Sequence, residues 1–92
     1  DFQDNVTNSY LLKITNKSKI DRQFDISVLN NNVTLSVADH ILIKGGEIAS
    51  VPVHLTMTPE EVTERVSEVS LQVSVHDLPE VKAITVTKFF SN

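Results

Sequence analysis

The sequence contains no cysteine. Without thiolates, these residues cannot form a disulfide, a structural cysteine–zinc site or the usual ligand set of an iron–sulfur cluster. Redox compartment is also left open, since a chain without cysteine is suited to either side of a membrane. Packing alone must stabilise 92 residues and 10.2 kDa, a length that allows one small domain.

Basic residues and long apolar runs are scarce too. There are 8 Lys and Arg against 12 Asp and Glu, a net charge of −4. No basic face can be assembled for phosphates, so we expect no nucleic-acid partner. No apolar run approaches the roughly 18 residues that a membrane-spanning helix needs, and no signal peptide is visible. The first residue is Asp1 rather than Met, so we expect a processed chain or a fragment of a larger protein.

β-Branched residues are abundant. Val, Ile and Thr supply 28 of the 92 residues, against 3 Ala, which favours strands over a helical bundle. Alternating apolar and polar residues predict strands over 9–16, 22–29, 33–37, 41–44, 47–57, 69–76 and 81–90. In the last of these we expect Ile84 and Val86 to face inward. Pro52 has no N–H, which predicts that its strand lies at a sheet edge or carries a bulge.

One segment departs from the strand pattern. Thr58 as N-cap, Pro59 as first helical residue and Glu61 as capping-box partner predict a single helical turn over 59–64, which crosses between two sheets. About seven short strands separated by turns predict an all-β, immunoglobulin-like sandwich over residues 1–92 as a single domain. Because the antibody cysteine pair and tryptophan are absent, a fibronectin-III-like or other cysteine-free sandwich fits better.

Candidate chemical sites are few. His54 and His76 on outer strand faces are candidate copper or zinc ligands if their strands are neighbours, whereas His40 lies in a turn and Met57 faces inward. Exposed surface histidines are the simpler interpretation. No serine occupies a glycine-flanked elbow, so no catalytic or cofactor-binding residue is assigned.

Other groups of residues have two interpretations. One acidic group is either a cation site or part of a solvated helical turn; it consists of Glu60, Glu61, Glu64 and Glu68. The adjacent Phe89 and Phe90 either contact a partner together or are one core residue beside one exposed residue. The triplets that begin at Asn5, Asn16 and Asn32 satisfy the glycosylation sequon, which has meaning only in a eukaryotic secretory protein.

Three stretches together resemble the C-terminal immunoglobulin-like domain of the FixG family, also called CcoG. They are Asn8-Ser9-Tyr10-Leu11-Leu12-Lys13-Ile14-Thr15-Asn16-Lys17, Gly45-Gly46-Glu47-Ile48-Ala49-Ser50-Val51-Pro52-Val53 and Lys88-Phe89-Phe90. The resemblance covers nearly the whole chain. The sequence stops at Asn92 without the Gly-Pro ending expected of the family.

The resemblance implies a bacterial inner-membrane protein with two [4Fe–4S] clusters in a ferredoxin-like part. That family is linked to assembly of cbb3-type cytochrome c oxidase through copper reduction, and its C-terminal domain is expected on the periplasmic side. Since the redox residues of the family are cysteines, no functional residue is carried over to this sequence. Clusters are expected only in the rest of the parent protein.

Three functional hypotheses follow. The preferred one is a non-catalytic accessory domain that docks on an oxidase subunit, a copper carrier or its own membrane-bound chain, for example by strand addition. The second is a periplasmic copper-handling module that uses His54 and His76. The third is a structural or adhesive sandwich from a cell-surface repeat protein.

Overall fold

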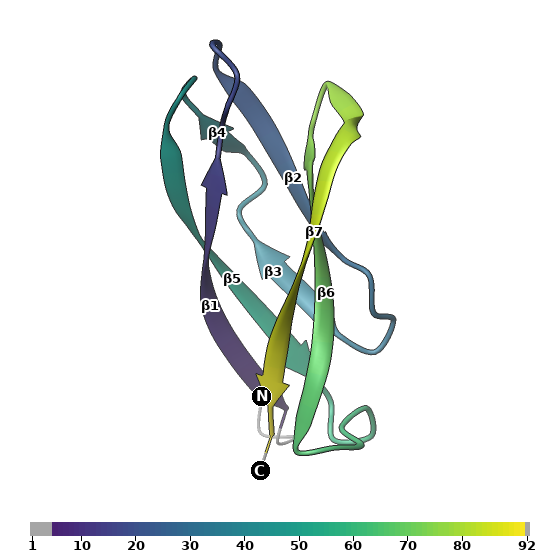
Figure 1. Ribbon diagram of the computed structural model, residues 1–92. Helices are drawn as coiled ribbons and strands as arrows, with labels where there is room; N and C mark the ends of the chain where they lie inside the picture. The colour runs from purple at the N-terminus through teal and green to yellow at the C-terminus, as the bar shows by residue number, and fades with distance from the viewer. Residues whose placement is uncertain (1–4, 92) are drawn as a thin grey trace.

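The computed structural model describes residues 5–91, in which seven β-strands form two sheets and there is no helix (Figure 1). The strands are β1 (Val6–Thr15), β2 (Arg22–Val28), β3 (Thr34–Val37), β4 (Ile41–Ile43), β5 (Ile48–Met57), β6 (Val66–Val75) and β7 (Leu78–Phe90). None of the described residues belongs to a helix that is long and apolar enough to cross a membrane.

The two sheets form the layers of a sandwich. One sheet has the order β1-β5-β3 and the other β4-β2-β6-β7, and every pair is antiparallel. The connection from β5 to β6 crosses between the sheets, as predicted. The all-β, immunoglobulin-like prediction is confirmed.

The core lies between the sheets and follows the alternation of the sequence. Because successive side chains point to opposite faces of a strand, one apolar set per strand is buried. The core residues are Ile14, Phe24, Val33, Ile41, Ile43, Val51, Val53, Leu55, Met57, Val69, Leu71, Val75 and Phe89. Burial of this apolar area is the main term that stabilises a domain without disulfides.

The expectation for Pro52 is wrong at the level of the sheet. Its strand, β5, is the central strand between β1 and β3, and the β1–β5 register runs without a bulge. However, the pairing of β3 with β5 ends at Val37 opposite Val53, the residue that follows Pro52. At Pro52, β5 is therefore paired only with β1, which accommodates a residue that has no N–H.

The inward placement of Ile84 and Val86 is also wrong. Phe89 is 1% exposed and points into the core, so the period of two places the even-numbered residues of β7 on the outer face. Ile84 lies opposite Gln72 and Val86 opposite Ser70, both outward residues of β6, and the two side chains are 58% and 56% exposed. The β6–β7 register shifts between Ser74 and Val75, where a bulge in β7 takes up extra residues.

The predicted helical turn is shorter than expected. The Glu61 carboxylate accepts a hydrogen bond from the Thr58 N–H at 2.9 Å, as one half of a capping box. The N–H groups of Glu61 and Val62 both donate to the Thr58 carbonyl, and no helix follows. One turn fixes several residues for few hydrogen bonds, and Val62 packs against the core, so the chain leaves the helical path there.

Asn16 fixes the corner after β1. Its side chain is 2% exposed. The amide Nδ2 donates hydrogen bonds to the carbonyls of Ile20 (2.9 Å) and Ile43 (2.8 Å). The amide Oδ1 accepts hydrogen bonds from the N–H and the hydroxyl of Ser18. Its backbone pairs with Glu47 and Gly46. The sequon that begins at Asn16 therefore lies at a buried amide.

The adjoining turn needs two glycines for different reasons. A Cβ at Gly45 would lie 2.6 Å from the carbonyl carbon of Lys19, so the backbones approach too closely for any side chain. Gly46 has φ +80, a left-handed conformation that favours glycine. The Gly45-Gly46 pair thus lets β1, the following loop and β5 meet at Asn16.

Candidate functional site

The structure does not bring the predicted histidine pair together. His54 lies on β5 in the three-stranded sheet, where its Nδ1 is 2.7 Å from the Ser9 hydroxyl. His76 lies in the β6–β7 turn at the end of the other sheet, with Nδ1 2.9 Å from the Asp25 carboxylate. His40 is exposed between β3 and β4, and Met57 is buried. The copper-handling hypothesis therefore lacks the neighbouring strands on which it depends.

The acidic group and the paired phenylalanines also have defined places. Within residues 5–91, no three His, Asp or Glu side chains gather as a metal site, so the four glutamates near the β5–β6 connection form none. Phe89 is 1% exposed and Phe90 is 57% exposed. The pair is thus one core residue beside one exposed residue.

The most distinctive surface is the open side of the sandwich between β1 and β7. Each is the edge strand of its sheet. In Figure 1 the two strands lie close together near the chain ends and diverge toward the β6–β7 hairpin. On the other side of the sandwich the edges are β3 and β4, of only 4 and 3 residues. The long edges, which need protection from unwanted pairing, therefore face one another.

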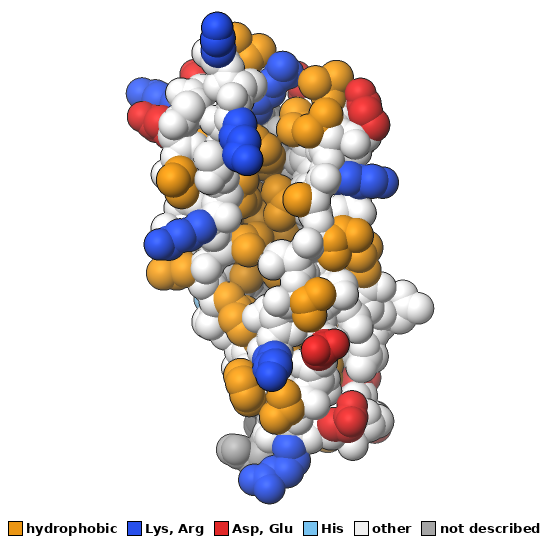
Figure 2. Space-filling view, in the orientation of Figure 1, with side chains coloured by type: hydrophobic (Ala, Val, Ile, Leu, Met, Phe, Trp, Pro, Cys, Tyr) orange, Lys and Arg blue, Asp and Glu red, His pale blue; other side chains and the backbone are white. Residues whose placement is uncertain are grey.

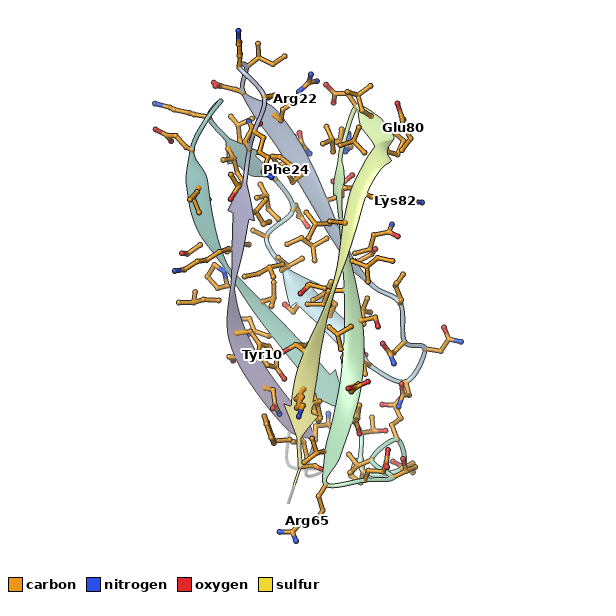
Figure 3. All side chains as sticks on the ribbon, in the orientation of Figure 1. Tyr10, Arg22, Phe24, Arg65, Glu80 and Lys82 are labelled. Atoms are coloured by element: carbon orange, nitrogen blue, oxygen red, sulfur yellow. The ribbon has the colours of Figure 1, made fainter. Side chains whose placement is uncertain are left out.

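Near the chain ends, side chains close the gap between the two strands. The Asn8 amide both donates to the Phe90 carbonyl and accepts from the Phe90 N–H, each at 2.9 Å. The Tyr10 hydroxyl donates to the Lys88 carbonyl at 2.6 Å (Figure 3). Partial burial raises the pKa of the Tyr10 phenol above its ordinary value of 10.0, so this donor keeps its proton at physiological pH.

Toward the hairpin the gap stays open and exposes apolar side chains. Figure 2 shows hydrophobic side chains in a column along the middle of this face. We call this open side the β1–β7 groove. At its hairpin end lies a pocket of about 330 Å³, lined by Thr15, Asn16, Lys17, Ser18, Arg22, Phe24, Val75, Leu78 and Val81. Its apolar walls come from β2, β6 and β7 of the four-stranded sheet, and the end of β1 with the loop after it supplies the polar side.

The backbone of β7 directs hydrogen-bonding groups toward this edge, and those beyond Lys88 have no partner strand among those described. The N–H and C=O of Phe90 and the C=O of Lys88 point toward β1. Alternate residues of a strand direct these groups to the same edge, so those of Val86 and Ile84 point there too. Among the described strands β7 pairs only with β6, which leaves this stretch of edge without a partner strand.

The mouth of the pocket is positively charged in an acidic protein. Lys17 and Arg22 line it and no carboxylate does. Within residues 5–91 the one ion pair joins His76 to Asp25, so no described carboxylate lies within ion-pair distance of Lys17 or Arg22. Figure 3 places Arg22 and Phe24 together at this end of the molecule. The groove thus combines apolar surface, a free strand edge and two unpaired cations.

Comparison with known proteins agrees with this architecture. Residues 2–92 match the family model described as the "IG-like fold at C-terminal of FixG", in which FixG is a candidate oxidoreductase. The chain belongs to this family. No curated protein matches the sequence.

A solved structure shows the same fold in a FixG relative. The crystal structure of a FixG-related protein from Vibrio parahaemolyticus superposes with a TM-score of 0.78 at 21% sequence identity. The match covers 96% of this chain and 81% of that chain. At this identity the likeness concerns the fold, and the FixG resemblance of the sequence is confirmed by the family match.

Sequence reasoning did not find the groove. Its lining comes from β1, β2, β6 and β7, and the pattern within each strand does not reveal which strands become edges. The opposite placement of Phe89 and Phe90 was a signal only for the faces of β7. With Phe89 taken as the core residue, the period of two would have placed Ile84 and Val86 on the outer face.

Proposed function

We propose that this chain is a non-catalytic interaction domain of a FixG-like [4Fe–4S] membrane protein, and that it serves the assembly of cbb3-type cytochrome c oxidase. The observation that carries the proposal is the β1–β7 groove, an apolar surface between two long strand edges in a FixG domain. Such a surface suits docking, because apolar burial and edge pairing both supply contact energy without any reactive group.

Redox chemistry belongs to the rest of the parent protein. Iron–sulfur clusters are held by cysteine thiolates, and this sequence has none, so its residues do not fit a cluster. The oxidoreductase activity, the reduction of copper and the anchoring in the bacterial inner membrane are placed outside these 92 residues. The domain itself lies on the periplasmic side, where its partner is an oxidase subunit, a copper carrier or its own membrane-bound chain.

The FixG family match supports this reading over the alternatives. An adhesive repeat domain has no support from the comparisons, and the copper-handling module lacks a joined histidine pair.

Capture from a membrane extract of the source organism tests the proposal. The immobilised chain is compared with Leu78→Asp, which places a charge in the pocket, and with Leu42→Asp, the same exchange on the outer face of β4. The proposal expects an identified oxidase subunit, copper carrier or membrane part of the parent to be retained by the wild type and Leu42→Asp and lost with Leu78→Asp. Equal capture by all three chains, or none at any salt concentration, contradicts it.

A further inference from the structure

We propose that the β1–β7 groove binds an extended segment of a partner protein by strand addition to β7, and that this segment carries an apolar side chain flanked by carboxylates. The inference rests on the proposed docking function and specifies the chemistry of the partner. It has three independent supports: the free backbone edge, the apolar pocket and the unpaired cations beside it.

The edge supplies the backbone contacts. Val86 and Ile84 direct their N–H and C=O groups into the groove, continuing the line that Asn8 and Tyr10 already use at Phe90 and Lys88. The Asn8 amide imitates a paired strand at this edge. An added strand therefore begins where these side-chain contacts stop and runs toward the hairpin.

The pocket supplies selection for an apolar side chain. Phe24, Val75, Leu78 and Val81 form its apolar walls, and its volume of about 330 Å³ accommodates a large side chain. On the inner face of β7, Thr85 and Ala83 are exposed although their parity directs them toward the core. The second sheet does not cover them, and an added strand would place its own inward side chains beside them.

The positive charges at the pocket favour carboxylates near the apolar residue of the incoming segment. Lys17 and Arg22 stand at the pocket without carboxylate partners among the described residues, whereas the whole chain carries a net charge of −4. Carboxylates on the incoming segment complement these two cations. A basic segment of a partner would instead be repelled by Lys17 and Arg22.

A second copy of the chain is a poorer occupant of this edge in the register that pairs Ile84 with Val86. In an antiparallel β7–β7 pair centred on Thr85, Ile84 faces Val86 and Lys82 faces Lys88. Like charges directly opposite one another destabilise such a pair. The outward position of both lysines, with Lys82 visible in Figure 3, therefore works against self-association in this register.

Binding of labelled synthetic peptides tests the inference, with fluorescence anisotropy as the readout. The probe carries glutamate two residues before and two residues after one phenylalanine, so that the three side chains share one face of the added strand. One control replaces glutamate by lysine, and another keeps the side chains but methylates the backbone nitrogens. We expect the glutamate peptide to bind at least about tenfold more tightly than either control, because only it has both the charge and the backbone donors.

Matched variants of the protein locate the binding. The double variant Lys17→Glu with Arg22→Glu is expected to weaken binding of the glutamate peptide about tenfold. Lys44→Glu with Arg65→Glu makes an equal change in net charge at residues that do not line the pocket and is expected to leave the affinity within about twofold. Val86→Pro removes one N–H from the free edge without breaking the β6–β7 ladder. We expect this variant to bind the glutamate peptide more weakly than the wild type does. Thermal unfolding establishes that each variant is folded.

Equal binding of the glutamate and lysine peptides, or unchanged affinity in Lys17→Glu with Arg22→Glu, overturns the inference. So does sedimentation that shows a dimer abolished by Val86→Pro, since the edge would then be occupied by a second copy. If the peptides fail while capture from the membrane extract still depends on Leu78, the strand-addition inference is wrong and the docking function stands.

Discussion

Asn8 binds Phe90 through both ends of its side-chain amide, at 2.9 Å each, and so joins the edges of the two sheets. The contact spans 82 positions of sequence and takes the geometry of a backbone pair. Where it and the neighbouring Tyr10–Lys88 hydrogen bond end, the β1–β7 groove opens. The groove is thus bounded at one end by side chains that act as a short substitute strand.

Removing the Asn8 amide is expected to loosen this closed end. Asn8→Ala deletes two hydrogen bonds of a half-buried group and lowers the free energy of unfolding by about 1.5 kcal/mol. Urea unfolding followed by circular dichroism measures the loss. Asn31→Ala, in an exposed turn, is the matched control with a change within about 0.5 kcal/mol. Equal effects of the two exchanges would show that the β1–β7 contact does not stabilise the fold.

Tyr10 offers an optical measurement of the same contact. It is the one tyrosine in a chain without tryptophan, so the ultraviolet absorbance of its phenolate reports this site alone. We expect its pKa to lie above 10.0 in the native protein and to return to the ordinary value in denaturant, because burial disfavours the charged form. A native pKa at or below 10.0 contradicts the burial.

The same shift predicts a dependence of stability on alkaline pH. A raised pKa means that the folded state holds the proton more tightly than the unfolded state does. The stabilising contribution is complete below the unfolded pKa and is lost as pH rises through the folded pKa of Tyr10. Tyr10→Phe removes this dependence and also the hydrogen bond to Lys88.

Asn16 is expected to be the most sensitive polar residue of the fold. Asn16→Ala leaves the buried Ile43 carbonyl without its donor and releases the turn at Ser18, which costs about 3 kcal/mol of unfolding free energy. Ser18→Ala removes only a hydroxyl and costs about 1 kcal/mol. Urea unfolding of both variants decides the order, and a loss at Asn16 no larger than that at Ser18 would contradict the role assigned to the buried amide.

His76 is expected to titrate above its ordinary value. The hydrogen bond to Asp25 is the main cause that raises its pKa above 6.5; the charge of Asp25 adds to it, and Asp77 contributes least. The stabilising contribution of the pair is complete below the unfolded pKa and is lost as pH rises through the folded pKa. NMR titration should show a clear fall of the His76 pKa in Asp25→Asn and a smaller one in Asp77→Asn. The reverse order would contradict the assigned causes.

Much of the fold follows from local patterns in the sequence. Strand positions and most buried residues are set by alternation, because each side chain's face is fixed by the period of two. The errors occurred where a distant partner decides the outcome. Central strand β5 accommodates Pro52 because the pairing with β3 ends one residue away. The outward face of Ile84 is set by the burial of Phe89.

The candidate site was less accessible from sequence than the fold. Asn16 stood as the last residue of the predicted strand 9–16, and nothing local reveals that its amide donates to the Ile43 carbonyl on another strand. The groove depends on the pairing order that makes β1 and β7 edges on the same side, and strand order cannot be read from alternation. Chemistry-bearing residue types such as histidine drew attention first, whereas the surface that best suits a partner consists of backbone edges and apolar side chains.

Mapping the glutamate–phenylalanine peptide onto the protein by amide NMR tests the central claim most directly. Strand addition predicts that the largest shift changes fall on the N–H groups of Ile84 and Val86 and on the pocket residues near Lys17 and Arg22. The exchange of the Ile84 and Val86 amides with solvent should slow when the peptide is bound. Shift changes confined to β3 and β4, or unchanged exchange at Ile84 and Val86 with saturating peptide, would contradict it.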